Sequence, residues 1–312
     1  MMFHASESEL PEAEEALYKT IVPLNKKRAI QLEDFADLYD REQLAKDEAY
    51  VAKFEAKFEE EGKGREASRK YGELFEAIVN DQIENADLMG PRASVIVPSR
   101  FDDIQRGVDS IVQFKQEKGA TSHLALAIDV TKSQLDVGQK FERVRKSIDD
   151  GELTKVKYFK TKNYRGELGP VARVVVGADH AVSEDISNLM LQFMRLKDTV
   201  AKRRAAGEDP DAFREYALRL AKVRRQLASH PLQEIVLTEI RAQLEAFQEY
   251  ARSRGKEDIE REYEKIIHIV DEVIAEKDAP SNPNKEIVDN DEMYKLIMDN
   301  AKNFNIRARA EH

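Results

Sequence analysis

The residues of this sequence best suited to chemistry are two aspartates, Asp109 and Asp129, in two short apolar stretches. The stretches cover residues 107–114 and 123–131, and the polar segment between them contains a glycine, as a β-hairpin connection requires. With the apex at residues 118–120, position 109 falls opposite position 129. Like charges that face each other across two strands destabilise a sheet by about 0.2–1 kcal/mol. The pair therefore predicts a divalent-metal site between the two carboxylates.

A purely structural explanation of the two aspartates stays open beside the metal site. Asp109 can be a turn or edge residue, and Asp129 can cap the helix that follows Thr131. A shift of one residue in the hairpin register would also turn a side chain to the other face of the sheet.

The elements that must position these aspartates are short strands and two helices between residues 65 and 178. Apolar residues at helical spacing predict one helix over residues 65–86 and an amphipathic helix over residues 135–150. Runs rich in β-branched residues predict three strands besides the hairpin arms, over residues 93–97, 156–159 and 171–176. This order indicates a mixed α/β core in which the second helix is a crossover connection.

The remainder of the chain is expected to be mainly helical. Apolar spacing predicts helices over residues 31–61, 183–206, 211–229, 231–254 and 256–277. Residues 1–28 are weakly patterned, and we expect them to be irregular or partly extended. Two prolines indicate a linker over residues 278–284, and residues 285–312 are expected to form one loosely attached helix.

The order of elements and acids resembles the PD-(D/E)XK nuclease-like superfamily. That family carries a glutamate on a leading helix, an aspartate in a hairpin, and a second acid in an acid-x-lysine motif before a crossover helix. The segment Tyr71-Gly-Glu-Leu-Phe-Glu-Ala77 is similar to the family's Gly-x-x-x-Glu pattern and selects Glu76. Asp109 and Asp129 take the two hairpin positions. The resemblance covers about residues 65–180 and implies a small mixed sheet flanked by helices, of the α+β or α/β class.

The sequence departs from this pattern at the motif lysine. Thr131 stands two residues after the second acid, where the family has lysine. Lys132 is adjacent but would point to the opposite face of a continuing strand. Lys140, near the start of the crossover helix, is the better substitute, because some members of the superfamily carry the lysine there. If neither lysine reaches the site, the protein would bind metal or DNA without cutting it.

The resemblance implies a hydrolytic site for phosphodiesters that depends on Mg²⁺ or Mn²⁺. Carboxylate oxygens suit such ions, and a bound ion offsets the charge of the scissile phosphate and activates a water. Asp109 and Asp129 would be direct ligands, while Glu76 would bind through water or complete a second metal position. Lys140 or Lys132 would orient the nucleophile and stabilise developing charge.

The distribution of charge favours a polyanionic partner despite a net charge of −10. Residues 1–62 carry 16 acidic and 8 basic side chains, whereas residues 140–173 and 195–225 each carry 10 basic and 5 acidic ones. Such local basic stretches suit nucleic acid. The candidate phosphate contacts are Lys157, Lys160, Lys162, Arg203, Arg204, Arg224 and Arg225. A half-exposed strand and arginine-rich surface helices with acidic partners are the alternative explanations.

Composition excludes several other classes of function. The chain has no cysteine, which rules out disulfides, thiolate zinc sites and cysteine nucleophiles. No run of 18 apolar residues is present, so we expect no membrane span. The first residues lack the pattern of a signal peptide, and a cytoplasmic location is expected.

Four regions are therefore predicted in the 312-residue chain: an acidic helical segment (1–64), a nuclease-like α/β core (65–180), a helical region (181–277), and a linker with a tail (278–312). The expected function is a metal-dependent nuclease that acts on DNA or, as second choice, RNA. The alternative is a catalytically inactive nuclease-like scaffold that binds nucleic acid or protein. Its helical regions could then contact a protein partner or a second copy of the chain.

Overall fold

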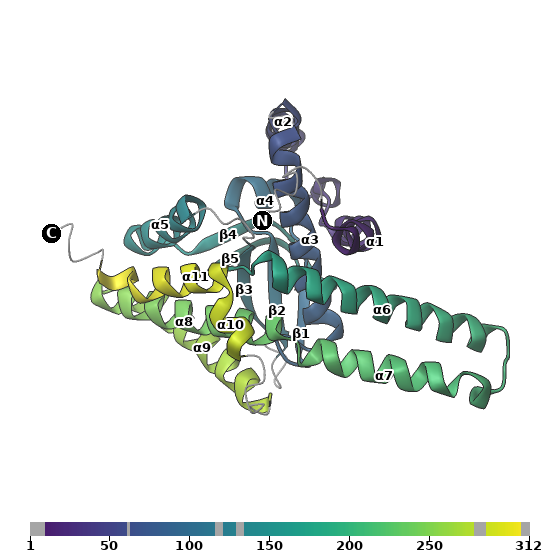
Figure 1. Ribbon diagram of the computed structural model, residues 1–312. Helices are drawn as coiled ribbons and strands as arrows, with labels where there is room; N and C mark the ends of the chain where they lie inside the picture. Colours follow the sequence, from purple (N-terminus) through teal and green to yellow (C-terminus); the bar gives the residue numbers. More distant parts are fainter. Residues whose placement is uncertain (1–9, 61–62, 116–120, 129–133, 278–284, 307–312) are drawn as a thin grey trace.

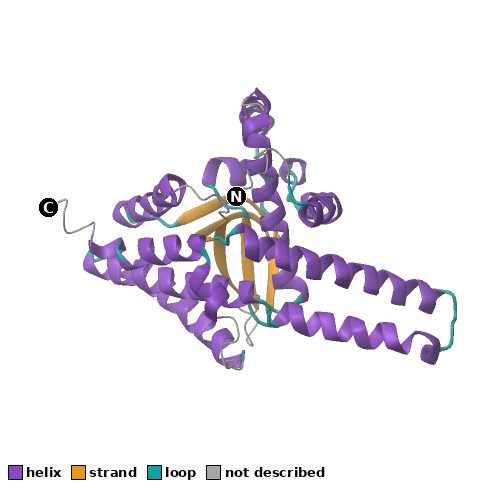
Figure 2. Ribbon diagram, in the orientation of Figure 1, coloured by secondary structure: helices purple, strands orange, loops and turns teal. Residues whose placement is uncertain are grey.

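A mixed five-stranded sheet lies at the centre of the molecule, with helices around it (Figures 1 and 2). The computed structural model describes residues 10–60, 63–115, 121–128, 134–277 and 285–306. The strands are β1 (Ala93–Ile96), β2 (Ser110–Lys115), β3 (Thr121–Ile128), β4 (Thr154–Lys160) and β5 (Arg165–Val176). Their order in the sheet is β1-β2-β3-β5-β4. The predicted class, a small mixed sheet flanked by helices, is confirmed.

The connectivity of the sheet combines a meander with one crossover. Strands β1, β2 and β3 pair antiparallel, whereas β5 runs parallel to β3 and β4 pairs antiparallel with β5. The crossover from β3 includes α5 (Gln134–Asp150), because a parallel neighbour cannot be reached by a tight turn. Helix α3 (Lys63–Asn85) precedes β1 and packs against β1 and β3.

The hairpin register differs from the prediction by two residues. Ser110 pairs with Leu126 and Lys115 with Thr121, so paired residue numbers sum to 236. This register puts position 109 level with position 127, not 129. Apolar alternation defines which residues share a face, but it leaves the length of the connecting loop open. Asp109 itself lies just before β2, and Asp129 lies outside the described residues.

The N-terminal segment is more helical than expected. Residues 1–28 were predicted to be irregular or partly extended, which is wrong for α1 (Glu12–Arg28). Leu17, Ile21 and Val22 are its buried stripe, and the helix packs against α3 and α6 (His180–Ala205). The many charges of α1 and its internal proline obscured that short apolar stripe.

The helix predicted over residues 31–61 is divided. It consists of a 3₁₀ turn, η1 (Leu32–Phe35), and α2 (Arg41–Glu60). Asp40 explains the new start, because its Oδ1 accepts a hydrogen bond of 2.7 Å from the backbone N–H of Gln43.

A short helix between β1 and β2 was not predicted. It is α4 (Arg100–Arg106), and the hydroxyl of Ser99 caps it by accepting from the backbone N–H of Asp102 at 3.1 Å. Gly107 ends the helix in a left-handed conformation with φ of 62°, which glycine adopts without strain. Because of this joint, Asp103 and Asp109 lie on either side of one sharp turn.

The C-terminal half packs onto the sheet and extends one arm away from it. Helices α8 (Pro231–Ser253) and α9 (Glu257–Glu276) pack against β5, with α10 (Lys285–Asn290) and α11 (Glu292–Lys302) beside α8. Helix α6 and α7 (Arg214–Ala228), joined through the 3₁₀ turn η2 (Pro210–Phe213), form an antiparallel pair that projects from the body (Figure 1). The largest hydrophobic cluster extends from Leu10 to Phe304.

Across the described residues, no helix is both long and apolar enough to cross a membrane.

Candidate functional site

A pocket of about 430 Å³ lies where α1, α2, α3 and α4 meet next to the start of β2. Its lining combines acidic, basic and apolar side chains from these elements. They are Val22, Asn25, Lys26, Ala29, Gln31, Glu55, Phe58, Arg69, Glu73, Glu76, Val97, Pro98, Arg100, Asp103 and Asp109. Two of the acids predicted from the sequence, Glu76 and Asp109, are thus brought together from α3 and from the residue before β2.

Glu76 is held in an environment that disfavours its charge. Burial raises the pKa of Glu76 well above its usual value, and the charges of Asp109 and Asp103 raise it further. The Nδ2 of Asn25 opposes this shift by donating to Oε1 of Glu76 at 2.9 Å. Compared with a carboxyl group in water, the protonated form of Glu76 is therefore favoured.

The carboxyl groups of Asp103 and Asp109 are hydrogen-bonded to each other. Burial raises the pKa of Asp103 to about 7, and the charge of Asp109 adds to the shift. The guanidinium of Arg100 forms an ion pair with Asp103 and acts in the opposite direction. Since an ionised carboxylate only accepts hydrogen bonds, a contact between two carboxyl groups needs a shared proton. Asp103 is therefore protonated in part of the molecules near neutral pH.

These three carboxyl groups fit a hard divalent cation by their chemistry. Their oxygens are ligands that Mg²⁺ accepts, and a cation between them would offset the repulsion that adds to the raised pKa values of Glu76 and Asp103. Within the residues that the structure describes, no group of three or more acids or histidines is arranged to hold a metal unaided. Mg²⁺ usually keeps several waters and takes only one or two carboxylates, so this arrangement fits such an ion when waters complete the shell.

A chain of buried hydrogen bonds orients Glu76 from behind. The hydroxyl of Ser110, on β2, donates to Oδ1 of Asn80 at 2.7 Å. The Nδ2 of Asn80 donates to Oδ1 of Asn25 at 3.1 Å, and Asn25 donates to Glu76. The chain links β2, α3 and α1, so the position of Glu76 depends on three elements at once.

Basic side chains enter the pocket from α1, α3 and α4. Lys26 forms an ion pair of 3.0 Å with Glu73, Arg100 one of 3.2 Å with Glu55, and Arg69 is exposed. The described lining does not include Lys140, which lies on α5, and Lys132 falls outside the described residues. The cations among the described lining residues are therefore Lys26, Arg69 and Arg100.

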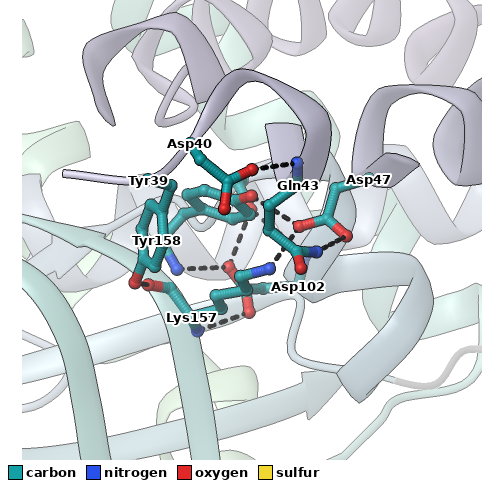
Figure 3. A network of polar contacts seen from close by, with 8 residues as sticks. Tyr39, Asp40, Gln43, Asp47, Asp102, Lys157 and Tyr158 are labelled. Carbon is teal, nitrogen blue, oxygen red and sulfur yellow. Dashed lines mark hydrogen bonds and ion pairs between the residues drawn. The ribbon is translucent and has the colours of Figure 1, made fainter. Parts of the chain in front are cut away.

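Asp102, the neighbour of Asp103, has a structural environment. The position of Asp102 and Asp103 before the hairpin favours a solvated loop, with a further metal ligand as the alternative. The loop is wrong, because both residues lie on α4 and Asp102 is fully buried. Its Oδ1 accepts from the backbone N–H of Lys157 at 2.7 Å, and its Oδ2 accepts from the N–H of Tyr158 at 3.0 Å. The hydroxyl of Ser99 also donates to Oδ2, at 2.7 Å. Asp102 therefore fastens α4 to β4 (Figure 3).

Lys157 belongs to this network, although its residue type suggested a phosphate contact. Its ammonium is 2.5 Å from Oδ2 of Asp47 on α2, and the hydroxyl of Tyr158 donates to the same oxygen at 2.5 Å (Figure 3). The ammonium also lies 5.2–5.3 Å from the ring centres of Tyr39, Phe101 and Tyr158. Lys157 thus holds α2 against β4, and its side chain is only 17% exposed.

The other predicted phosphate contacts remain at the surface. Lys160 forms an ion pair of 2.8 Å with Asp34, and Lys162 is exposed at the β4–β5 turn. On the α6–α7 arm, Arg203 contacts Glu208 at 2.9 Å. Arg204, Arg224 and Arg225 are exposed on the arm, away from the pocket.

Sequence reasoning treated Asp103 only as a less favoured further ligand, and it missed Arg100 and Asn25 as members of the site. A signal for Asp103 and Arg100 was present, because Ser99-x-x-Asp102 is a helix N-terminal capping pattern and would have placed a helix here. Asn25 lies in the segment expected to be irregular, and no pattern connected it to Glu76. Comparison of the chain with protein-family models, with curated proteins and with solved structures gave no match in any of the three.

Proposed function

We propose that the pocket is the active site of a metal-dependent nuclease that hydrolyses phosphodiester bonds in DNA, with RNA as the second substrate. The observation that carries this proposal is the convergence of Glu76, Asp103 and Asp109, from three elements, in one pocket that also contains basic side chains. The element order adds support. A helix with the glutamate, a three-stranded meander, a crossover helix and a parallel strand follow the order implied by the resemblance to PD-(D/E)XK nucleases.

The acidic side chains, Asn25 and the basic side chains of the pocket each have a role in this proposal. Asp109, Asp103 and Glu76 would hold Mg²⁺ or Mn²⁺, with Asp129 as a further ligand. When bound, such an ion offsets phosphate charge and lowers the pKa of a water. Asn25 keeps Glu76 oriented by its hydrogen bond. The positive charge that the family supplies with a lysine would come from Lys26, Arg69 or Arg100, which line the pocket.

Asp109→Asn tests the catalytic part of the proposal. The variant keeps the size of the side chain but removes one negative charge, so cleavage of DNA with Mg²⁺ or Mn²⁺ should fall at least about 100-fold. Mn²⁺ affinity, measured by calorimetry, should fall in parallel. Asp150→Asn, at the exposed end of α5, is the matched control. Metal-dependent cleavage that is equal in the wild type and Asp109→Asn would contradict the proposal.

The second candidate is a nuclease-like protein that binds nucleic acid, or a protein partner, without catalysis. Two observations favour it: Lys140 is not among the described residues that line the pocket, and the described acids do not form a metal site unaided. Binding of DNA with no cleavage under any tested combination of Mg²⁺, Mn²⁺ and substrate would select this candidate. Association with a partner or a second copy through the helical regions, and a cytoplasmic location, stay part of the proposal.

For either candidate function, we propose that the α6–α7 arm contacts the phosphate backbone of the nucleic acid. Replacing Arg203, Arg204, Arg224 and Arg225 by Glu should weaken binding to every DNA sequence alike. Each lost phosphate contact should reduce the slope of log affinity against log salt by about 0.7–0.9. Metal binding in the pocket should not change, because none of these four arginines is among the described residues that line it. An unchanged salt slope would assign the arm to protein packing instead.

A further inference from the structure

An aromatic row on α2 leads into the pocket and ends in an exposed ring. Tyr50, Phe54 and Phe58 follow one another at intervals of four residues, so they share one face of the helix. The ring centres of Tyr50 and Phe54 are 4.7 Å apart, and those of Phe54 and Phe58 are 6.4 Å apart. At the other end of the row, Tyr50 contacts Phe101 on α4, with ring centres 5.8 Å apart. Phe58 lines the pocket and is 38% exposed.

Helix α2, which carries Phe58 and forms one wall of the pocket, is attached to its neighbours at several points. Asp47 binds Lys157 and Tyr158 on β4, and Glu55 binds Arg100 on α4 at 3.2 Å. These contacts hold α2 over the acidic part of the pocket. A ring on a fixed wall is oriented before a ligand arrives, which reduces the entropy lost on binding.

The side chains around Phe58 favour a ligand with both an anionic part and a flat apolar part. Lys26, Arg69 and Arg100 supply positive charge in the same pocket. Proteins that bind single strands combine basic grooves with aromatic side chains on which bases stack. The volume of about 430 Å³ falls in the range of pockets that enclose small molecules, roughly 300–1,000 Å³. It suits a single nucleotide, whereas the interior base pairs of a duplex are stacked on both faces and offer none to Phe58.

We propose that Phe58 is a base-stacking residue and that the substrate of the pocket is an unpaired nucleotide, in a single strand or at an opened end. The proposal rests on the nuclease function proposed above and specifies its substrate class. The base stacks on Phe58, Lys26, Arg69 or Arg100 contacts its phosphates, and the neighbouring phosphodiester reaches Glu76, Asp103 and Asp109.

The test uses the full chain and a 12-nucleotide single-stranded DNA with 2-aminopurine at one position, in Ca²⁺ and in EDTA. Stacking on Phe58 should change the fluorescence of the 2-aminopurine when the wild type binds. Phe58→Ala should weaken binding of the single strand about 5- to 30-fold and abolish that change. Phe58→Tyr, which keeps an aromatic face, should restore both. The affinity for a blunt duplex of the same sequence should fall less than about twofold in Phe58→Ala.

The matched control is Leu38→Ala, which removes another exposed apolar side chain from the same N-terminal segment. Thermal unfolding of each variant checks that the fold is retained. An equal loss of affinity for single strand and duplex in Phe58→Ala, or no loss for either, would overturn the single-strand proposal. If the wild type still cleaves duplex DNA in that case, the nuclease proposal survives. A wild type that binds no nucleic acid would overturn both.

Discussion

Two neighbouring aspartates on α4 occupy opposite kinds of environment. Asp102 is buried, and two backbone N–H groups and one hydroxyl donate to its carboxylate. Asp103 faces a second carboxyl group, and Arg100 opposes the repulsion. Burial raises the pKa of both residues, but the hydrogen bonds lower that of Asp102, whereas the charge of Asp109 raises that of Asp103. Hydrogen-bond donors therefore distinguish a structural acid from one suited to bind a cation.

The largest expected effect is the loss of stability on removing Asp102. Asp102→Ala leaves two buried backbone N–H groups and a hydroxyl without their acceptor, each worth about 1–3 kcal/mol. We expect the free energy of unfolding in urea to fall by about 3–5 kcal/mol. Asp150→Ala, which changes an exposed acid on α5, should stay within about 0.5 kcal/mol of the wild type. A loss below about 1 kcal/mol for Asp102→Ala would remove the distinction between the two aspartates.

Asp103→Asn should instead increase stability above neutral pH. With a pKa raised from 3.8 to about 7, folded Asp103 keeps a proton that the unfolded chain has released. The free energy of unfolding of the wild type should therefore fall as pH rises from about 4 to about 7. The variant should lose much of this pH dependence and gain about 1–3 kcal/mol at pH 8, reduced by the loss of the Arg100 ion pair.

Urea titrations at several pH values measure this difference. Glu48→Gln, which removes one charge from the exposed face of α2, controls for net charge and should keep the pH dependence of the wild type. If Asp103→Asn follows the wild type at every pH, Asp103 is not under the repulsion that its position indicates.

The smallest effect is expected for Asn25, which provides the pocket with one of its few neutral donors. Asn25→Ala leaves Glu76 without this donor and Asn80 without an acceptor, so stability should fall by about 1–2 kcal/mol. The pKa of Glu76 should rise further, and Mn²⁺ binding should require a higher pH. Calorimetry across pH measures this change. Lys27→Ala, an exposed residue of α1, should show neither effect, and an unchanged pH profile in Asn25→Ala would exclude a role in orienting Glu76.

The sequence was sufficient for the elements whose apolar residues repeat over many positions. Helices α3, α5, α8 and α9 and strands β1 and β4 were predicted close to their observed bounds, because each buries an apolar stripe or run. Strand β5 was predicted only over its buried residues 171–176, and it begins earlier, at Arg165. Helix α4, with seven residues, is too short for periodicity and depends on its cap at Ser99 and on Gly107. The buried stripe of α1 was too sparse to recognise.

Within the candidate site, prediction was limited by contacts that no local pattern encodes. Glu76 and Asp109 were found because motif positions fall on a helix and a strand end. Asp103 joins them only because Gly107 reverses the chain between α4 and β2. The links from Asn25 to Glu76 and from Asp102 to β4 join residues 51 and 55 positions apart. Such pairings follow from the packing of whole elements, and no local pattern in the sequence reveals them.

All described residues that line the pocket lie between Val22 and Asp109, whereas the hydrophobic cluster that supports them continues to Phe304. On a ribosome that adds about 5–20 residues per second, the last of this cluster is made roughly 10–40 s after the pocket residues. During that interval the nascent chain carries the acids but lacks strand β5 and helix α8 for part of the time. We expect a product truncated before α8 to contain every described pocket residue and still to lack a formed site. The order of synthesis therefore delays the formation of this pocket until the residues of the supporting cluster have been made.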